Sequence, residues 1–254
     1  MIVNAPEALD MPLIRRLGAS CDLTQADEEA LARLIGSPAR EFSPRHDLAR
    51  EGDTGRHVRL VGDGWACRYK STLEGKRQIV GFILPGDFCD LSAYLLGHMD
   101  HSISAITRIR VALITPESLD ALITGHPSLA NAFWRLELIN ASMQREWLLS
   151  LGQRTAYERI GHLLIELFSR LRAAGLVDGN SCAFPLTQND LADATGLSPV
   201  HVNRTLRELR LQGLVELDRK RLRLPDLATL AEASGFLPNY LHADPKERHV
   251  GVYA

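Results

Sequence analysis

Cationic side chains concentrate in one stretch near the carboxyl end of the chain. Residues 201–223 hold more basic than acidic residues, although the net charge of the whole chain is only −2. The basic residues are Arg204, Arg207, Arg210, Arg219, Lys220, Arg221 and Arg223, against Glu208, Glu216 and Asp218. A guanidinium group offers paired N–H donors that match phosphate oxygens or the O6 and N7 acceptors of guanine. A basic patch on a nearly neutral chain therefore predicts a polyanionic partner.

The sequence before these arginines predicts two short helices joined by a tight turn. Thr187 is suited to cap the first helix, with the acidic Asp190 in its first turn. Gly196 permits the left-handed backbone that ends such a helix. Ser198 is suited to cap the second helix, with Pro199 at its first position, where no N–H is needed.

A β-hairpin with a basic tip is predicted directly after the second helix. The segments Leu214-Val215-Glu216-Leu217 and Arg221-Leu222-Arg223-Leu224 flank Asp218-Arg219-Lys220. Val202, Leu206 and Leu209 give the preceding helix an apolar stripe that faces inward. A helix–turn–helix followed by a basic wing is typical of proteins that bind duplex DNA.

The polar face of the second helix provides the candidates for DNA recognition. We expect Arg204 to contact guanine and Val200 to touch a thymine methyl group. Asn203 or His201 is expected to donate to or accept from a base edge. The base-reading candidates are Val200, His201, Asn203 and Arg204. The phosphate-contacting candidates, which would position the protein without reading sequence, are Thr187, Gln188, Ser198, Arg207, Arg219 and Lys220.

Two different periodicities precede this region. Residues 41–116 are short apolar runs separated by Gly- and Asp-containing turns, which predict an all-β sandwich, roll or barrel. Asp22–Leu34 before them is expected to be helical, and another helix is expected to begin at Thr155. The segment from Ala173 to Ser181 is expected to be a loop.

Between residues 127 and 151, apolar residues recur at steps of three and four. This spacing predicts a short coiled coil between two subunits, with one polar residue that sets the register. Its predicted dimer-interface residues are Phe133, Leu136, Asn140, Met143 and Trp147. The alternative is a helix that lies on the core of its own chain, and Trp134, Leu138 and Ile139 widen its apolar surface enough for both roles. Gly152 is expected to end this helix and to act as a hinge.

Taken together, these motifs resemble the Crp/Fnr family of bacterial transcription factors. The matching residues are Gly52-Asp53, Gly62-x-Gly64, Gly86-Asp87-Phe88, Leu186-Thr187-Gln188, Gly196-Leu197-Ser198 and Asn203-Arg204-Thr205-Leu206. The resemblance implies an α+β fold with a cyclic-nucleotide-binding-like β-roll (a jelly roll) in residues 1–126. It further implies a dimerisation helix and hinge in 127–152, a winged helix-turn-helix in 153–241 and a tail in 242–254. The implied partners are double-stranded DNA with an inverted repeat, a second copy of the chain, and RNA polymerase.

The chain departs from the family pattern at the cyclic-nucleotide cassette. Cyclic-nucleotide binders of the family carry Gly-Glu-Leu and then Arg-Ser-Ala, whereas this chain has Cys89-Asp90-Leu91 and Asp100-His101-Ser102-Ile103. Because a histidine lacks the paired donors of a guanidinium, we expect no control by cyclic AMP. If an unknown effector binds, its pocket is expected at Gly86, Asp87, Cys89, Asp90, Leu91, His101 and Ser102.

A second departure concerns base reading. The family commonly has Glu four residues before the guanine-reading arginine, and here that position is Val200. The usual half-site therefore cannot be assumed.

Other chemistries find little support. Cys21 stands alone near the amino terminus, which excludes an iron–sulfur cluster of the Fnr type, and no C-x-x-C pair, disulfide framework or diagnostic haem histidine is present. Cys67 and Cys89 are expected to be buried, and Cys182 would be a redox switch only if it were exposed. No His-x-His cluster indicates a metal-dependent barrel enzyme, so we expect no catalytic residues, metal or cofactor.

The remaining alternative in function is a small-molecule sensor whose winged helix is vestigial. The retained Arg204 and Arg207 and the basic wing tip argue against it. No signal peptide or bilayer-spanning segment is visible, which predicts a cytoplasmic protein.

Overall fold

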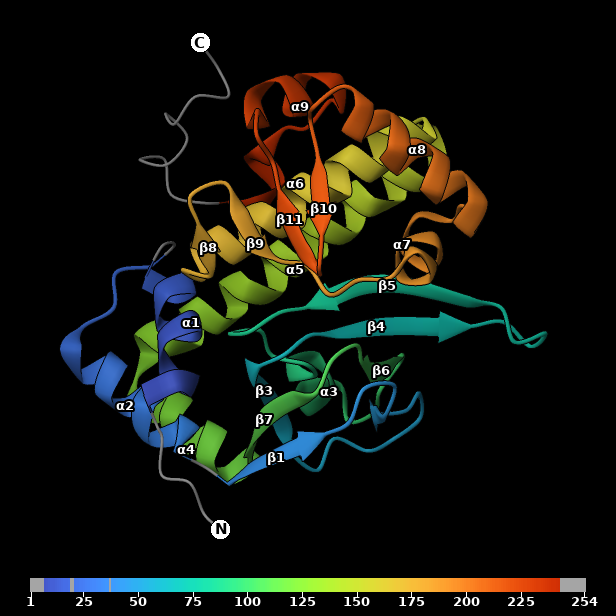
Figure 1. Cartoon of the computed structure of the whole chain (residues 1–254). Coiled ribbons are helices and arrows are strands. Elements are labelled where there is room, and N and C mark those ends of the chain that lie inside the picture. The colour runs from blue at the N-terminus through green and yellow to red at the C-terminus, as the bar shows by residue number, and fades with distance from the viewer. Residues whose placement is uncertain (1–6, 19–20, 37, 243–254) are drawn as a thin grey trace. The chain divides into compact units, whose positions relative to one another are not determined.

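The block of short apolar runs forms the strands of a β-roll, as predicted. The computed structural model describes residues 7–18, 21–36 and 38–242 and divides into two units, Met1–Gly75 with Gly81–Leu138 and Lys76–Val80 with Ile139–Ala254. The strands of the roll are β1 (Ala39–Phe42), β2 (Asp47–Ala49), β3 (Val58–Asp63), β4 (Ala66–Ser71), β5 (Arg77–Ile83), β6 (Ser102–Ala105) and β7 (Ile109–Ile114) (Figure 1).

These strands form two sheets, one in the order β1-β7-β3 and the other in the order β2-β6-β4-β5. The pairs β1–β7, β3–β7, β2–β6 and β4–β6 are antiparallel. Phe42, Val61, Ile103 and Val111 come from both sheets and are buried in one apolar cluster. The fold class predicted for this part of the chain is therefore confirmed.

Helices add a second apolar cluster to the first unit. They are α1 (Glu7–Gly18), α2 (Gln25–Ile35), α3 (Leu91–Leu96) and α4 (Pro116–Gly125). The expected helix from Asp22 is confirmed as α2, and it begins after a capping box between Thr24 and Asp27. Helix α1 was not predicted from the sequence, and its Leu13 and Leu17 are completely buried in this cluster.

The second unit is the predicted winged helix. Its elements are α6 (Ala156–Ala173), β8 (Val177–Asp178), β9 (Ser181–Ala183), α7 (Gln188–Thr195), α8 (Pro199–Leu211), β10 (Glu216–Asp218), β11 (Arg221–Arg223), α9 (Leu227–Ala233) and η1 (Pro238–Leu241). A sheet in the order β10-β11-β9-β8 contains the wing. Leu164 and Phe168 of α6 and Leu206 of α8 are buried in this unit. The predicted tail from residue 243 onward lies outside the described residues.

The long helix α5 (Pro127–Gln153) passes through both units. Phe133 and Leu136 are buried in the apolar cluster of the first unit, together with Leu13 and Leu31. Phe133 and Leu136, which were predicted to lie in a dimer interface, are thus already covered by their own chain, and their part in a subunit contact stays a prediction. The alternative of a helix lying on its own core is confirmed for this part of α5.

Residues of the predicted seam in the carboxyl-terminal part of α5 also have contacts within their own chain. Met143 is buried within the single chain. The indole N–H of Trp147 donates to both carboxylate oxygens of Glu166, each at 3.1 Å. Asn140 is half-buried. The helix continues through Gly152 and ends at Gln153, so Gly152 belongs to the last helical turn and does not interrupt the helix.

No helix in the described ranges is both long enough and apolar enough to cross a lipid bilayer.

Candidate DNA-binding interface

Side-chain caps hold α7, the turn and α8 in the predicted helix–turn–helix. The Thr187 hydroxyl oxygen accepts from the Asp190 backbone N–H at 3.2 Å, and Asp190 accepts in return from the Thr187 backbone N–H at 2.8 Å. Gly196 ends α7 with φ of +66°, in the left-handed region. Ser198 caps α8 by accepting from the His201 backbone N–H at 3.2 Å. The local signals in the sequence therefore have the structural roles expected of them.

The two faces of α8 separate as the apolar stripe predicts. Val202 and Leu209 are fully buried, whereas the Val200 side chain is 80% exposed. Asn203 and Arg204 are exposed and His201 is half-buried. The predicted base-reading residues thus lie together on the exposed side of the first two turns of α8. This surface has the width of one helix, which a DNA major groove admits.

The predicted phosphate-contacting residues surround this surface. Gln188 and Ser198 are exposed at the amino-terminal ends of α7 and α8, and Arg207 is exposed one turn beyond Arg204. Backbone N–H groups at such helix ends favour anions. The hydroxyl of Thr187 donates to Asp190 at 2.7 Å, so its hydrogen is already used within the chain.

His201 and Arg204 contact each other, which the sequence alone did not reveal. The Nη2 atom of Arg204 lies 3.1 Å from the Nε2 atom of His201. An arginine has no acceptor, so in this hydrogen bond Arg204 donates and Nε2 of His201 accepts. Residues three apart on a helix are neighbours, and this contact restricts the guanidinium to one side of the helix while its other N–H groups stay available.

The wing is a two-residue hairpin. Asp218 pairs with Arg221 across β10 and β11, which leaves Arg219 and Lys220 as the turn. Both turn residues have positive φ, at 44° and 62°. Asn-Gly is the sequence that favours this turn geometry, and side chains such as Arg and Lys adopt it at a cost. The wing tip therefore carries strain at two exposed cations.

Replacing Arg219-Lys220 by Asn-Gly, the sequence that favours this turn, is expected to change the stability of the protein and its DNA affinity in opposite directions. We expect Arg219→Asn with Lys220→Gly to raise the melting temperature, because the strain disappears. The same variant will weaken binding to every duplex, and the slope of log K against log salt will fall by about 0.9 for each phosphate that the protein no longer neutralises. Thermal unfolding and binding at several salt concentrations measure the two effects. An unchanged salt slope would remove Arg219 and Lys220 from the phosphate-contacting set.

The predicted effector pocket is occupied by contacts within the first unit. Asp90 is buried and accepts a hydrogen bond from the Arg59 backbone N–H at 2.7 Å, and its carboxylate also pairs with the Arg59 guanidinium. Arg68 donates to the backbone oxygens of Phe88 at 2.7 Å and Cys89 at 3.3 Å. Burial raises the pKa of Asp90, and the charge of Arg59 opposes that shift. Asp90 is therefore committed to an internal partner.

The glycine and aspartate of the same loop meet α1. A Cβ atom on Gly86, whose φ is +86°, would lie 2.8 Å from backbone atoms of Pro12 and Leu13, so only glycine fits this approach. Asp87 accepts from the Leu84 backbone N–H at 2.7 Å and forms an ion pair with Arg16. These contacts bind the loop to the amino-terminal helix.

His101 and Ser102 lie at the start of β6, and they too have partners in the chain. Nδ1 of His101 is 2.6 Å from the Asp100 carboxylate, and the Ser102 hydroxyl accepts from the Glu51 backbone N–H at 3.0 Å. Loss of solvation lowers the pKa of His101, and the charge of Arg68 acts in the same direction. His101 is therefore neutral at pH 7 and is a poor partner for a cyclic phosphate.

We expect cyclic AMP to leave the thermal stability of the protein unchanged. A ligand that binds only the folded state at a hundred times its Kd adds about 2.7 kcal/mol to the free energy of unfolding. No such increase should occur with about 1 mM cyclic AMP, a concentration that would saturate a site with micromolar Kd. A saturable rise in melting temperature would contradict this prediction.

The cysteines offer no reactive thiol on the DNA-binding unit. Cys182 forms no disulfide bond and is only 1% exposed. Burial raises the pKa of its thiol to about 11, so the nucleophilic thiolate is scarce at neutral pH. The condition for a redox switch at Cys182, exposure, is not met. Cys67 and Cys89 are buried, as expected. In the described parts of the chain, no group of three or more His, Cys, Asp or Glu side chains is arranged to hold a metal ion.

Two protein-family models match this chain, one on each unit. Residues 39–126 match the cyclic nucleotide-binding domain, and residues 158–233 match the Crp-like helix-turn-helix domain. The second match contains the whole candidate interface on α7, α8 and the wing.

Individual proteins are similar over most of the chain. The nitrogen fixation regulation protein FixK of Azorhizobium caulinodans is 30% identical over 201 residues, which cover 77% of this chain and 79% of that protein. The transcriptional activator protein FnrA of Stutzerimonas stutzeri is 29% identical, with 84% and 86% covered. Among solved structures, FixK2 from Bradyrhizobium japonicum has a TM-score of 0.69 at 25% identity and covers 78% of this chain and 96% of its own.

Proposed function

This chain belongs to the Crp/Fnr family of DNA-binding transcriptional regulators, and from that premise we propose that it acts as a homodimer on an inverted-repeat operator without control by cyclic AMP. The observation that carries this proposal is the exposed face of α8, where Val200, Asn203 and Arg204 can enter a major groove. Two-fold symmetry of the protein would be matched by the symmetry of the operator.

We place the dimer contact on the exposed face of α5. Trp134, Leu138 and Leu148 are 60%, 66% and 73% exposed. With Ala141 and Arg145 between them, these positions follow steps of four, three, four and three, which is the heptad spacing of a coiled coil. Large exposed apolar side chains in such a row favour a protein partner. A second copy of the same helix has the matching spacing.

The positions proposed for the dimer contact are shifted by about one residue from those predicted from the sequence, which is a rotation of about 100° around the helix axis. Phe133 and Leu136 face the first unit's own core, and the neighbouring positions 134 and 138 remain for a subunit contact. One helix thereby covers the roll with one side and offers the other side to a second chain.

The control of this regulator is proposed to lie outside cyclic-nucleotide binding. The internal partners of Asp90, Asp87 and His101 support this view, since they use the groups that a ligand would need. We expect RNA polymerase to be a partner, because FnrA, to which this chain is similar, is a transcriptional activator. We also expect the protein to act in the cytoplasm, where its DNA is.

Selection of bound duplexes from a random pool tests the proposal. The purified protein, without added effector, is expected to enrich an inverted repeat at about 0.15 M salt, where non-specific binding is weak. The enrichment should disappear with Arg204→Ala. If intact dimers enrich no repeat, then an effector is required and autonomous binding is wrong. Enrichment of a single half-site without symmetry would contradict the homodimeric arrangement.

A sensor with a vestigial winged helix is the second candidate. It would leave the exposed cations of α8, Arg204 and Arg207, and those of the wing tip without a role. Absence of any salt-dependent duplex binding would favour it.

A further inference from the structure

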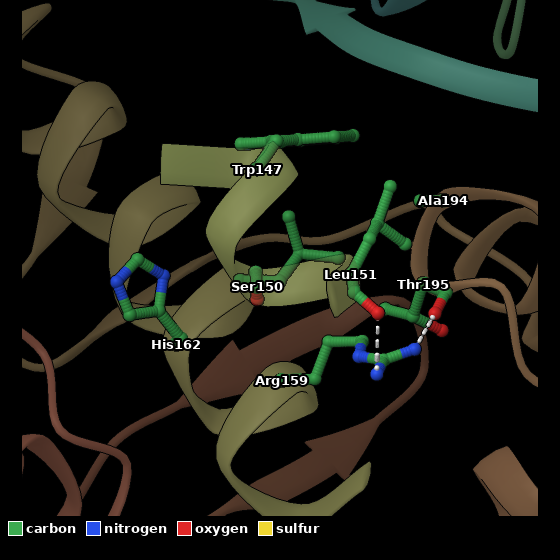
Figure 2. Close-up of a pocket in the computed structure, with 8 residues that line it drawn as sticks. Trp147, Ser150, Leu151, Arg159, His162, Ala194 and Thr195 are labelled. Atoms are coloured by element: carbon green, nitrogen blue, oxygen red, sulfur yellow. Dashed lines mark hydrogen bonds between the residues drawn. The ribbon is translucent and has the colours of Figure 1, made fainter. Parts of the chain in front are cut away.

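Arg159 lies in the first helical turns of α6 and binds three backbone carbonyl groups of other segments. Its guanidinium donates to the oxygen of Thr195 at 2.6 Å, to that of Leu151 at 3.0 Å and to that of Arg154 at 3.0 Å. Figure 2 shows the Leu151 and Thr195 oxygens approaching the guanidinium from two different segments. A single side chain thus connects the end of α5, the α5–α6 connection and the end of α7.

The position of these carbonyls explains why a cation is accommodated here. Leu151 lies in the last turn of α5, and Thr195 is the last residue of α7. The last carbonyl groups of a helix have no partner within the helix and together carry about half a negative charge. The guanidinium therefore lies between two helix ends whose charge is opposite to its own. Loss of solvation lowers the pKa of Arg159. The guanidinium nevertheless stays charged at neutral pH, because arginine is not deprotonated in proteins.

Apolar packing at this junction is incomplete. A cavity with room for about one water molecule (≈ 20 Å³) lies among Leu151, Leu163 and Ala194. The turn glycine Gly196 approaches the same place, since a Cβ atom there would lie 3.4 Å from Leu151 and 3.8 Å from Arg159. Arg159 lines the same cavity, so its hydrogen bonds to Leu151 and Thr195 join the segments on either side of the unfilled space.

Other contacts attach α5 to α6 but do not involve α7. Trp147 of α5 donates to Glu166 of α6, and Arg154 in the α5–α6 connection forms an ion pair with Glu146 of α5 at 2.5 Å. Arg159 extends this connection to Thr195, directly before the turn that leads into α8. One guanidinium thus hydrogen-bonds to both the end of α5 and the last residue of α7, in addition to the packing of α6 on α7 and α8.

We infer that Arg159 is a positioning residue that determines the half-site spacing this regulator accepts. The inference rests on the proposed function, in which α5 joins two subunits and α8 reads one half-site in each. In such a dimer, the angle between α5 and the helix–turn–helix sets the distance between the two recognition helices. One added base pair moves a half-site by about 3.4 Å and about 35° around the DNA axis. A rigid junction rejects that change, and a loose junction tolerates it.

Operators with altered spacers test this role. The palindrome selected by the wild-type protein is compared with versions that have one or two base pairs added or removed, and with a single half-site. Arg159→Met removes all the carbonyl hydrogen bonds with little change in volume. Arg159→Lys keeps the charge but cannot bridge several carbonyls at once. The matched control is Arg172→Met, which removes an arginine that stacks on Phe168 near the other end of α6.

The wild type and Arg172→Met are expected to prefer one spacer over its neighbours strongly. Arg159→Met should lower that preference by about tenfold, because a looser junction no longer holds the second recognition helix at a high effective concentration over one half-site position. The preference of Arg159→Lys should lie between those of the wild type and Arg159→Met. Affinity for the single half-site and the preferred bases should stay unchanged. Thermal unfolding identifies any variant that does not fold, and Arg159→Lys then provides the comparison.

Two outcomes would overturn the inference. A folded Arg159→Met or Arg159→Lys dimer that keeps the wild-type spacer preference shows that other contacts fix the junction. Equal weakening on all spacers and on the single half-site shows that Arg159 supports only the fold. By contrast, failure of the wild-type protein to select any inverted repeat would refute the proposed dimeric function itself.

Discussion

Replacing Trp134 and Leu138 together by glutamate is expected to convert the dimer to monomers and to lower affinity for the palindrome by at least about a hundredfold. Both side chains are more than half exposed in the single chain, so the change leaves the apolar core intact. In a parallel pair of α5 helices, the new carboxylates would face each other across the two-fold axis. Joining two half-site contacts in one dimer raises affinity by about 10² to 10⁴, and a monomer does not have that gain.

Sedimentation equilibrium and binding to the palindrome measure this result. Leu73→Glu is a suitable control, because Leu73 is a fully exposed apolar residue that lies away from α5, in the turn between β4 and β5. A Trp134→Glu, Leu138→Glu protein that sediments as a dimer would show that the subunits meet elsewhere. Monomers that still bind the palindrome with wild-type affinity would separate dimerisation from recognition.

Arg204→Ala is expected to reduce discrimination at one base pair of each half-site by about 1–3 kcal/mol, or roughly five- to 150-fold. The guanidinium is exposed on α8, and its contact with His201 limits the orientations it must give up on binding. Affinity for random DNA should change much less, because phosphate contacts provide most of that term. Competition between the selected operator and single-base variants measures the effect.

Arg207→Ala on the same helix is the matched control. Arg207 is exposed one turn further along and is assigned to phosphate. Its removal should weaken all duplexes by a similar factor and lower the salt slope by about 0.9. If Arg204→Ala also weakens cognate and random DNA equally, then Arg204 does not read a base.

The helix–turn–helix was predictable because its determinants are local. Thr187 and Ser198 cap helices within three residues of themselves, and Gly196 supplies its own positive φ. Such interactions depend on residues adjacent in sequence, so they can be recognised without a structure. The capping box that begins α6 at Thr155 follows the same rule.

The face of α5 that stays exposed, and that we propose for the subunit contact, could not be predicted in this way. Positions 133 and 134 are both large and aromatic, and a step of three or four can be continued from either one. Only the fold brings Leu13 and Leu31 against Phe133 and leaves Trp134 outside. Which side of a helix becomes buried is decided by the residues that pack on it, and those residues are distant in sequence.

The sequence by itself therefore predicted the strands of the roll, helix α2 and the winged helix-turn-helix with its exposed face on α8, because short-range capping, turn chemistry and apolar periodicity encode them. It did not predict α1, or the short strands β8 and β9 in and beside the segment 173–181 that was expected to be a loop. Tertiary structure alone decided that α1 meets the cassette loop through Gly86 and that Asp90 is paired with Arg59. It also decided that Arg159 joins two helix ends. These features depend on contacts between residues that are far apart in sequence. A pattern of residue types does not show which distant residues come close together.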